Sequence, residues 1–149
     1  MARSVGFILT VIGLIAGLSD GVKAAGPSAQ LTAMITTAAT EHGLPEALLH
    51  RIIKRESNYN ARAYHGGHWG LMQIKYETAR SMGYRGPAAG LLNPETNLRF
   101  GGRYLAGAYL VAGGNSERAV RLYSSGYYYE AKRKGLLPAT RLKAEGKGP

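Results

Sequence analysis

The sequence contains no cysteine and almost no aspartate. None of its 149 residues is Cys, and its single Asp is Asp20. The missing thiols exclude disulfides, thiolate metal sites, cysteine nucleophiles and lipid attachment at cysteine. The missing aspartates exclude EF-hands, aspartic-protease dyads and Ser-His-Asp triads from the chain beyond its first two dozen residues. Any acid chemistry there must therefore use glutamate.

The first residues have the pattern of an export signal. Arg3 supplies a short positive region, residues 5–18 are almost wholly apolar, and Val22-Lys23-Ala24 has the small-residue pattern of a cleavage site. The apolar run is shorter than the roughly 20 residues of a membrane-spanning helix. We therefore predict a cleaved signal peptide over residues 1–24, the alternative being an uncleaved anchor. The mature protein is then expected in a bacterial periplasm or outside the cell, with no stable membrane insertion.

The chain is strongly basic, with a formal net charge of +10 at pH 7. Removal of residues 1–24 takes away Arg3, Lys23 and Asp20 and leaves about +9. This charge favours an anionic partner such as nucleic acid, anionic lipid or the cell wall. The basic residues are scattered, except for Lys132-Arg133-Lys134, and no nucleic-acid-binding motif accompanies them. We therefore expect a solvated basic surface and no nucleic-acid partner.

Helix signals recur along the rest of the chain. Asn93-Pro94-Glu95 and Asn115-Ser116 are typical of helix starts, and Gly43 is typical of a helix end. Apolar spacing and these signals predict helices over residues 28–42, 45–56, 75–82, 93–113 and 115–126, with a polar loop over 58–70. No alternating strand of useful length and no internal repeat is present. The sequence thus predicts one all-α domain over residues 25–137 and a basic, flexible tail over residues 138–149.

Glu56 interrupts an apolar helix face. Leu49, Ile52 and Ile53 recur at helical spacing, and Glu56 continues the same face. It also lies near the helix C-terminus, where the helix dipole disfavours negative charge. Both effects predict a raised pKa, which suits a carboxylic acid that protonates a glycosidic oxygen. The alternative is a frayed last turn, with Glu56 in solvent or paired with Arg55.

Four motifs follow one another between Leu44 and Gly126. They are Glu56-Ser57-Asn58-Tyr59-Asn60; Gly70-Leu71-Met72-Gln73-Ile74 with Thr78-Ala79; Leu92-Asn93-Pro94-Glu95-Thr96-Asn97-Leu98 with Gly102 and Tyr104-Leu105; and Tyr123-Ser124-Ser125-Gly126. In this order and close to this spacing, they resemble the SLT-type lytic transglycosylases of bacterial cell walls. The resemblance implies a single goose-lysozyme-like all-α domain with a substrate cleft across it.

The resemblance also implies roles for five residues. Glu56 would be the sole catalytic acid/base. Gln73 would hydrogen-bond the sugar, and Met72 would help form the floor of the cleft. Tyr123 would point its hydroxyl toward the catalytic carboxylate, and Ser57 would help fix the local backbone.

The implied reaction needs one carboxylate. Glu56 would protonate the oxygen between N-acetylmuramic acid and N-acetylglucosamine, and the substrate's own N-acetyl group would stabilise the cationic centre. Glu56 would then take the proton of the muramoyl 6-hydroxyl as a 1,6-anhydro ring closes. Most glycosidases use two carboxylates, whereas Glu77, the next glutamate after Glu56 in the sequence, falls on a different predicted helix. The alternatives are a hydrolytic muramidase of the same fold and a peptidoglycan-binding protein without catalysis.

Two stretches depart from the family pattern. Tyr64 to Gly70 stands where a serine and a Gly-Ala-x-Gly are usual, and Ser124-Ser125 stands where Asn and Ala are usual. Neither change removes Glu56, Gln73 or Tyr123, so we expect an active enzyme with altered subsite contacts.

The remaining expectations concern partners. His65 and His68 have no carboxylate or thiol beside them, so we expect neither a metal nor another cofactor. Trp69 and Tyr127-Tyr128-Tyr129 could stack on sugars, although packing is the commoner role of such residues. We expect a monomer that acts on glycan strands, either in general wall turnover or in service of a secretion or flagellar assembly.

Overall fold

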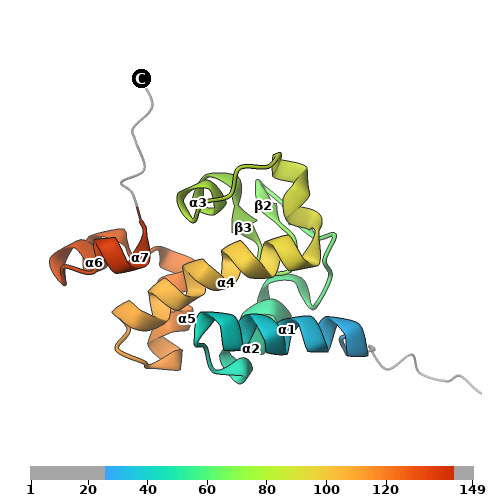
Figure 1. The fold of residues 1–149 in the computed structure, drawn as a ribbon, viewed down its shortest axis with the longest axis horizontal. Helices are drawn as coiled ribbons and strands as arrows, with labels where there is room; N and C mark the ends of the chain where they lie inside the picture. Colours follow the sequence, from blue (N-terminus) through green and yellow to red (C-terminus); the bar gives the residue numbers. More distant parts are fainter. Residues whose placement is uncertain (1–25, 143–149) are drawn as a thin grey trace, which may run out of the picture.

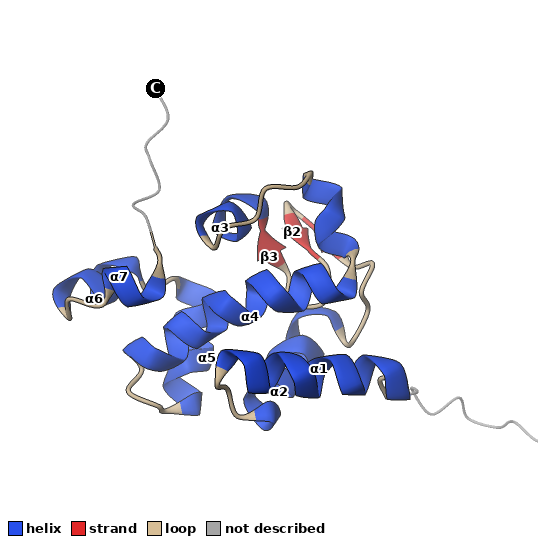
Figure 2. Cartoon of the chain, viewed as in Figure 1, coloured by secondary structure: helices blue, strands red, loops and turns tan. Residues whose placement is uncertain are grey.

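Seven α-helices, one 3₁₀ helix and a small sheet make up residues 26–142, which are the residues that the computed structural model describes (Figures 1 and 2). The predicted signal peptide, residues 1–24, lies outside them. In chain order the elements are α1 (Ala29–His42), α2 (Glu46–Ser57), β1 (Tyr64–His65), β2 (His68–Trp69), β3 (Ile74–Lys75), α3 (Tyr76–Ser81), η1 (Ala88–Leu92), α4 (Pro94–Val111), α5 (Ser116–Ser125), α6 (Tyr128–Arg133) and α7 (Leu137–Thr140). The prediction of a single, mostly helical domain is confirmed.

Helix α4 is the central element of the fold. It packs against α1 and α5, and also contacts α3, η1 and α7. In Figure 1 it crosses the middle of the molecule, with α1 and α2 on one side and the strands and α3 on the other. Leu98, Leu105, Ala108 and Val111 form its buried stripe at helical spacing. The other helices therefore keep their positions by packing on α4.

The predicted helix starts are capped as their residue types suggest. The Ser28 side chain accepts from the backbone N–H of Leu31, Asn93 accepts from Thr96, and Asn115 accepts from Arg118 at 2.9 Å. Each cap satisfies one of the free N–H groups of the first turn. The structure thus bears out the five predicted helices, with their bounds shifted by one or two residues.

A three-stranded antiparallel sheet in the order β1-β2-β3 accompanies the expected helices. Gly66 and Gly67 both have positive φ, 54° and 84°, and form the two-residue turn between β1 and β2. Such turns favour glycine because an L side chain is strained at positive φ. Each strand has two residues, too few to show an alternating pattern, so the predicted polar loop contains a hairpin.

The segment after α5 differs from the expected outline. Helix α6 follows Gly126, and α7 occupies residues 137–140, so it extends into the stretch 138–149 assigned to the flexible tail. Leu136, Leu137 and Leu142 pack against the core, which explains why the chain stays folded there. Residues 143–149 lie outside the described part of the chain. Within that part, no helix combines the length and the apolar character needed to cross a membrane.

Candidate active site

The last turn of α2 carries Glu56 away from a wholly buried face. Leu49, Ile52 and Ile53 have no exposed surface, whereas the Glu56 side chain is 23% exposed. The helix ends immediately afterwards, because Asn58 adopts the left-handed conformation with φ 49° and its N–H bonds to the Lys54 carbonyl at 3.1 Å. Glu56 therefore sits where a buried helix face meets solvent.

Glu56 is paired with its neighbour Arg55. The Arg55 Nε lies 3.0 Å from Glu56 Oε1, and Arg55 Nη2 contacts the same oxygen. Nη2 also contacts Ser124 Oγ, so one guanidinium joins the end of α2 to the end of α5. This is the pairing that the sequence left open as an alternative for Glu56. The carboxylate is consequently held next to the last turn of α5.

Ser57 ties the same turn to the segment that carries Gln73. Its Oγ lies 2.7 Å from the Leu71 carbonyl and 3.2 Å from the Ile53 carbonyl. The hydroxyl has one hydrogen, which these two carbonyls share. The contact with Leu71 therefore joins the end of α2, directly after Glu56, to residues 70–73.

Gln73 uses its amide hydrogens inside the protein. Its Nε2 donates to the carbonyls of Ala63, at 3.1 Å, and Gly70, at 2.9 Å. The residue is 8% exposed and has φ 47°, a strained conformation for a residue other than glycine. Both donors are engaged, so the side-chain atom available to a ligand is the carbonyl oxygen Oε1.

Met72 is fully buried and is fixed by its backbone. Its N–H donates to Asn97 Oδ1 at 2.8 Å, and its carbonyl accepts from the Tyr123 hydroxyl at 2.7 Å. Its side chain lies against Gly101 of α4, where an added Cβ would come within 2.7 Å of the Met72 sulfur. Met72 therefore lies beneath the site residues and not in contact with solvent.

Tyr123 is hydrogen-bonded to Met72 and is influenced by the charge of Glu56. Burial raises the pKa of Tyr123 well above its usual value, and the Glu56 charge raises it further. The hydroxyl thus stays protonated, and its hydrogen is committed to the Met72 carbonyl. The sequence interpretation expected the hydroxyl to point toward Glu56, and the hydrogen bond that the structure gives it is to the Met72 carbonyl.

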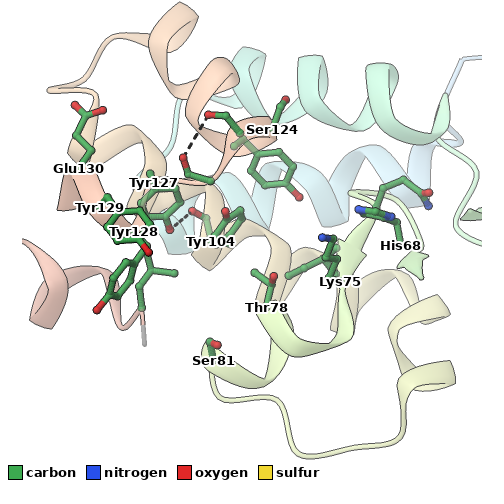
Figure 3. Close-up of a pocket in the computed structure, with 16 residues that line it drawn as sticks. His68, Lys75, Thr78, Ser81, Tyr104, Ser124, Tyr127, Tyr128, Tyr129 and Glu130 are labelled. Atoms are coloured by element: carbon green, nitrogen blue, oxygen red, sulfur yellow. Dashed lines mark hydrogen bonds between the residues drawn. The ribbon is translucent and has the colours of Figure 1, made fainter. Parts of the chain in front are cut away.

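A cleft of about 550 Å³ opens beside these residues (Figure 3). Gln73, Tyr123 and Ser124 line it, and so do the aromatic residues Tyr127 and Tyr128. Glu56, Ser57 and Met72 are outside the lining. Arg55, the partner of Glu56, contacts the cleft residue Ser124.

With this geometry in place, one comparison with known proteins decides the family. Residues 33–137 match the family model of the transglycosylase SLT domain. The chain belongs to this family. The SLT domain is a lysozyme-like, lytic-transglycosylase-type fold that acts on peptidoglycan.

Asn97 of this SLT domain stands in the third sequence motif, where the sequence interpretation assigned it no role. It is fully buried on α4, and its Nδ2 donates to the carbonyls of Trp69 and Leu91, each at 2.8 Å. Its Oδ1 accepts from the Met72 N–H. The sequence does place Asn97 next to Leu98, on the face of the helix that is predicted to be buried. A polar side chain on such a face needs buried hydrogen-bond partners, and this could have indicated its structural role.

The carboxylate that lines the cleft of this SLT domain, within residues 26–142, is Glu130 of α6. Its side chain is 16% exposed and contacts Arg118, and its Oε1 is also 3.3 Å from Lys134 Nζ. Two cations thus neutralise this acid. Tyr127, three residues before it, donates its hydroxyl hydrogen to the Tyr104 carbonyl at 2.7 Å, and burial raises the pKa of Tyr127.

Proposed function

We propose that the protein is a peptidoglycan lytic transglycosylase with Glu56 as its single acid/base. The observation that carries the proposal is the position of Glu56, at the exposed end of a buried face and paired with Arg55, which contacts the cleft residue Ser124. The described acid that lines the cleft, Glu130, is occupied by Arg118 and Lys134. A one-carboxylate reaction fits this arrangement better than a reaction that needs two.

The proposed reaction proceeds in two proton transfers. Protonated Glu56 donates to the oxygen that bridges N-acetylmuramic acid and N-acetylglucosamine, and the bond from that oxygen to the muramoyl C1 breaks. The substrate's N-acetyl group stabilises the charge at C1. Ionised Glu56 then accepts the proton of the 6-hydroxyl, whose oxygen bonds to C1 and closes the 1,6-anhydro ring. Because this hydroxyl is tethered to the reacting sugar, its effective concentration is high and no water has to be positioned.

The other predicted residues serve binding and position. Gln73 presents Oε1 as a hydrogen-bond acceptor for a sugar hydroxyl or amide. Met72 forms the support under it through its backbone bonds, and Tyr123 fixes the Met72 carbonyl. Ser57 keeps the Glu56 turn in register with residues 70–73. Arg55 must release Glu56 before the carboxyl can donate a proton. The guanidinium can keep its hydrogen bond to Ser124 when the ion pair opens.

Mass spectrometry of muropeptides tests the proposal. The full mature chain and the Glu56→Gln variant would each digest purified sacculi. We expect products lighter than hydrolytic ones by one water, about 18 Da, because a tethered hydroxyl replaces water. These products should be absent with Glu56→Gln. The matched control is Glu117→Gln, which changes an exposed glutamate of α5 that pairs with Arg51 outside the cleft.

Other outcomes would change the function. Reducing-end products that also depend on Glu56 would identify a hydrolytic muramidase. Binding to sacculi without cleavage by any variant would identify a wall-binding protein.

We also propose that the protein is exported and works on the wall from the periplasm or from outside the cell. The pattern of residues 1–24 supports this. N-terminal sequencing of the protein recovered from its native host would show a start at Ala25, and a start at Met1 would contradict cleavage.

A further inference from the structure

The three strands place three basic side chains in one row. His65 pairs with His68 between β1 and β2, and His68 pairs with Lys75 between β2 and β3. Directly paired residues in an antiparallel sheet project from the same face. The other face of the same sheet carries Tyr64, Trp69 and Ile74, so the basic residues are gathered on one side.

The row reaches the cleft. His68 and Lys75 both line it, and Lys75 is exposed. Figure 3 shows these two residues at the end of the cleft opposite Tyr128 and Glu130. Lys75 follows Gln73 by two residues, so its ammonium group belongs to the part of the cleft that holds the proposed sugar-binding amide.

The charge of the row is not neutralised within the described chain. No carboxylate of residues 26–142 lies within 4.0 Å of the side-chain nitrogens of His65, His68 or Lys75. The His68 Nδ1 donates to the His65 carbonyl at 3.1 Å, so Nε2 can donate to a carboxylate when the ring is protonated. Glu130, the acid of the cleft, is already paired with Arg118 and Lys134. The free charge at this end of the cleft is therefore positive.

We propose that the row formed by His65, His68 and Lys75 binds a carboxylate of the peptide carried by the glycan strand. The inference rests on the proposed function, and it adds a preference for strands whose peptides are ionised. Uncharged sugar rings offer an ammonium group hydrogen bonds but no opposite charge, whereas the peptide stems of peptidoglycan end in carboxylates. A cation in a partly enclosed cleft attracts such a group and forms a charge-assisted hydrogen bond with it. Lys75 is thus a specificity-determining residue that acts away from the bond being broken.

Two forms of one substrate test this inference. Purified glycan strands with intact peptides would be compared with the same strands after their carboxylates are converted to methylamides. For the wild-type chain we expect kcat/KM to be about three- to tenfold higher on the ionised strands at low salt, the range of one partly exposed ionic contact. The ratio should fall toward one as salt is added.

Variants of Lys75 give the decisive comparison. Lys75→Met should bring the ratio close to one by raising KM on ionised strands, with kcat unchanged, because the contact is the same in the bound and the reacting substrate. Lys75→Glu should reverse the preference. The matched control is Lys132→Met, which removes an exposed lysine of α6 outside the cleft lining and should keep the wild-type ratio. Equal thermal unfolding of all variants would show that folding is intact.

The results separate the two proposals. Equal cleavage of both substrates by the wild-type chain, or an unchanged ratio in Lys75→Met, would overturn the carboxylate site and leave the transglycosylase in place. Failure to cleave either substrate would instead overturn the proposed function.

Discussion

Replacement of Asn97 by Ala should lower the free energy of unfolding by about 3–5 kcal/mol. The side chain is fully buried and makes three hydrogen bonds of 2.8 Å, to the Met72 N–H and to the Trp69 and Leu91 carbonyls. Each buried polar group left without a partner costs about 1–3 kcal/mol. Water cannot easily replace the lost atoms, because Gly70 lies so close that an added Cβ there would be 2.4 Å from Asn97 Nδ2.

Urea unfolding followed by circular dichroism measures this loss. Asn93→Ala is the matched control on the same helix, since it removes an exposed N-cap and should cost only about 1 kcal/mol. Asn97→Asp keeps the size of the side chain but turns its donor toward two carbonyls into an acceptor. It should be destabilising at neutral pH and recover in part in acid, where a protonated carboxyl can donate again. A loss of unfolding free energy below about 1 kcal/mol for Asn97→Ala would refute the conclusion that Asn97 satisfies three buried backbone groups, because three unpaired groups cannot cost so little.

Two further predictions concern a histidine and an arginine. Burial lowers the pKa of His42 below its usual 6.5, although a hydrogen bond to the Leu98 carbonyl opposes the shift. Neutral His42 therefore stabilises the fold above pH 6.5, and this stabilisation is lost as the pH falls through the lowered pKa. His42→Gln should therefore flatten the fall of the unfolding free energy between about pH 7 and pH 5, and an unchanged slope would contradict this. Arg55→Met should raise turnover on sacculi by up to about fivefold, because it removes a partly exposed ion pair that must open before Glu56 can donate. A tenfold loss would instead show that Arg55 contacts the substrate.

Helices could be predicted from the sequence because their signals are local. Ser28, Asn93 and Asn115 each bond to a backbone N–H three residues ahead, so the cap and its partner are read within one turn. The strands gave no such pattern because each has two residues. The one local signal was Gly66-Gly67, a pair that favours the tight turn of a hairpin.

The fold of the chain after Gly126 depends on contacts with residues far away in the sequence. This segment is held by three leucines that pack against the core: Leu136, Leu137 and Leu142. The surrounding sequence is rich in Lys, Gly and Pro, so its local pattern does not predict this packing. The same holds for part of the site. The place of Glu56 at the end of a buried face follows from helical spacing, whereas its link through Arg55 to Ser124 joins residues 69 positions apart.

The segment 70–73 explains how a site with one carboxylate can keep its geometry. Ser57 of α2, Asn97 of α4 and Tyr123 of α5 each bond to its backbone. All three ties are hydrogen bonds of uncharged side chains, so they persist while the carboxylate gains and loses its proton. The position of the cleft amide relative to the end of α2 is therefore fixed independently of the charge on the proposed acid. Such a frame suits a reaction that depends on holding one acid and one tethered hydroxyl in place, since misplacement by about 1 Å can slow catalysis about a hundredfold.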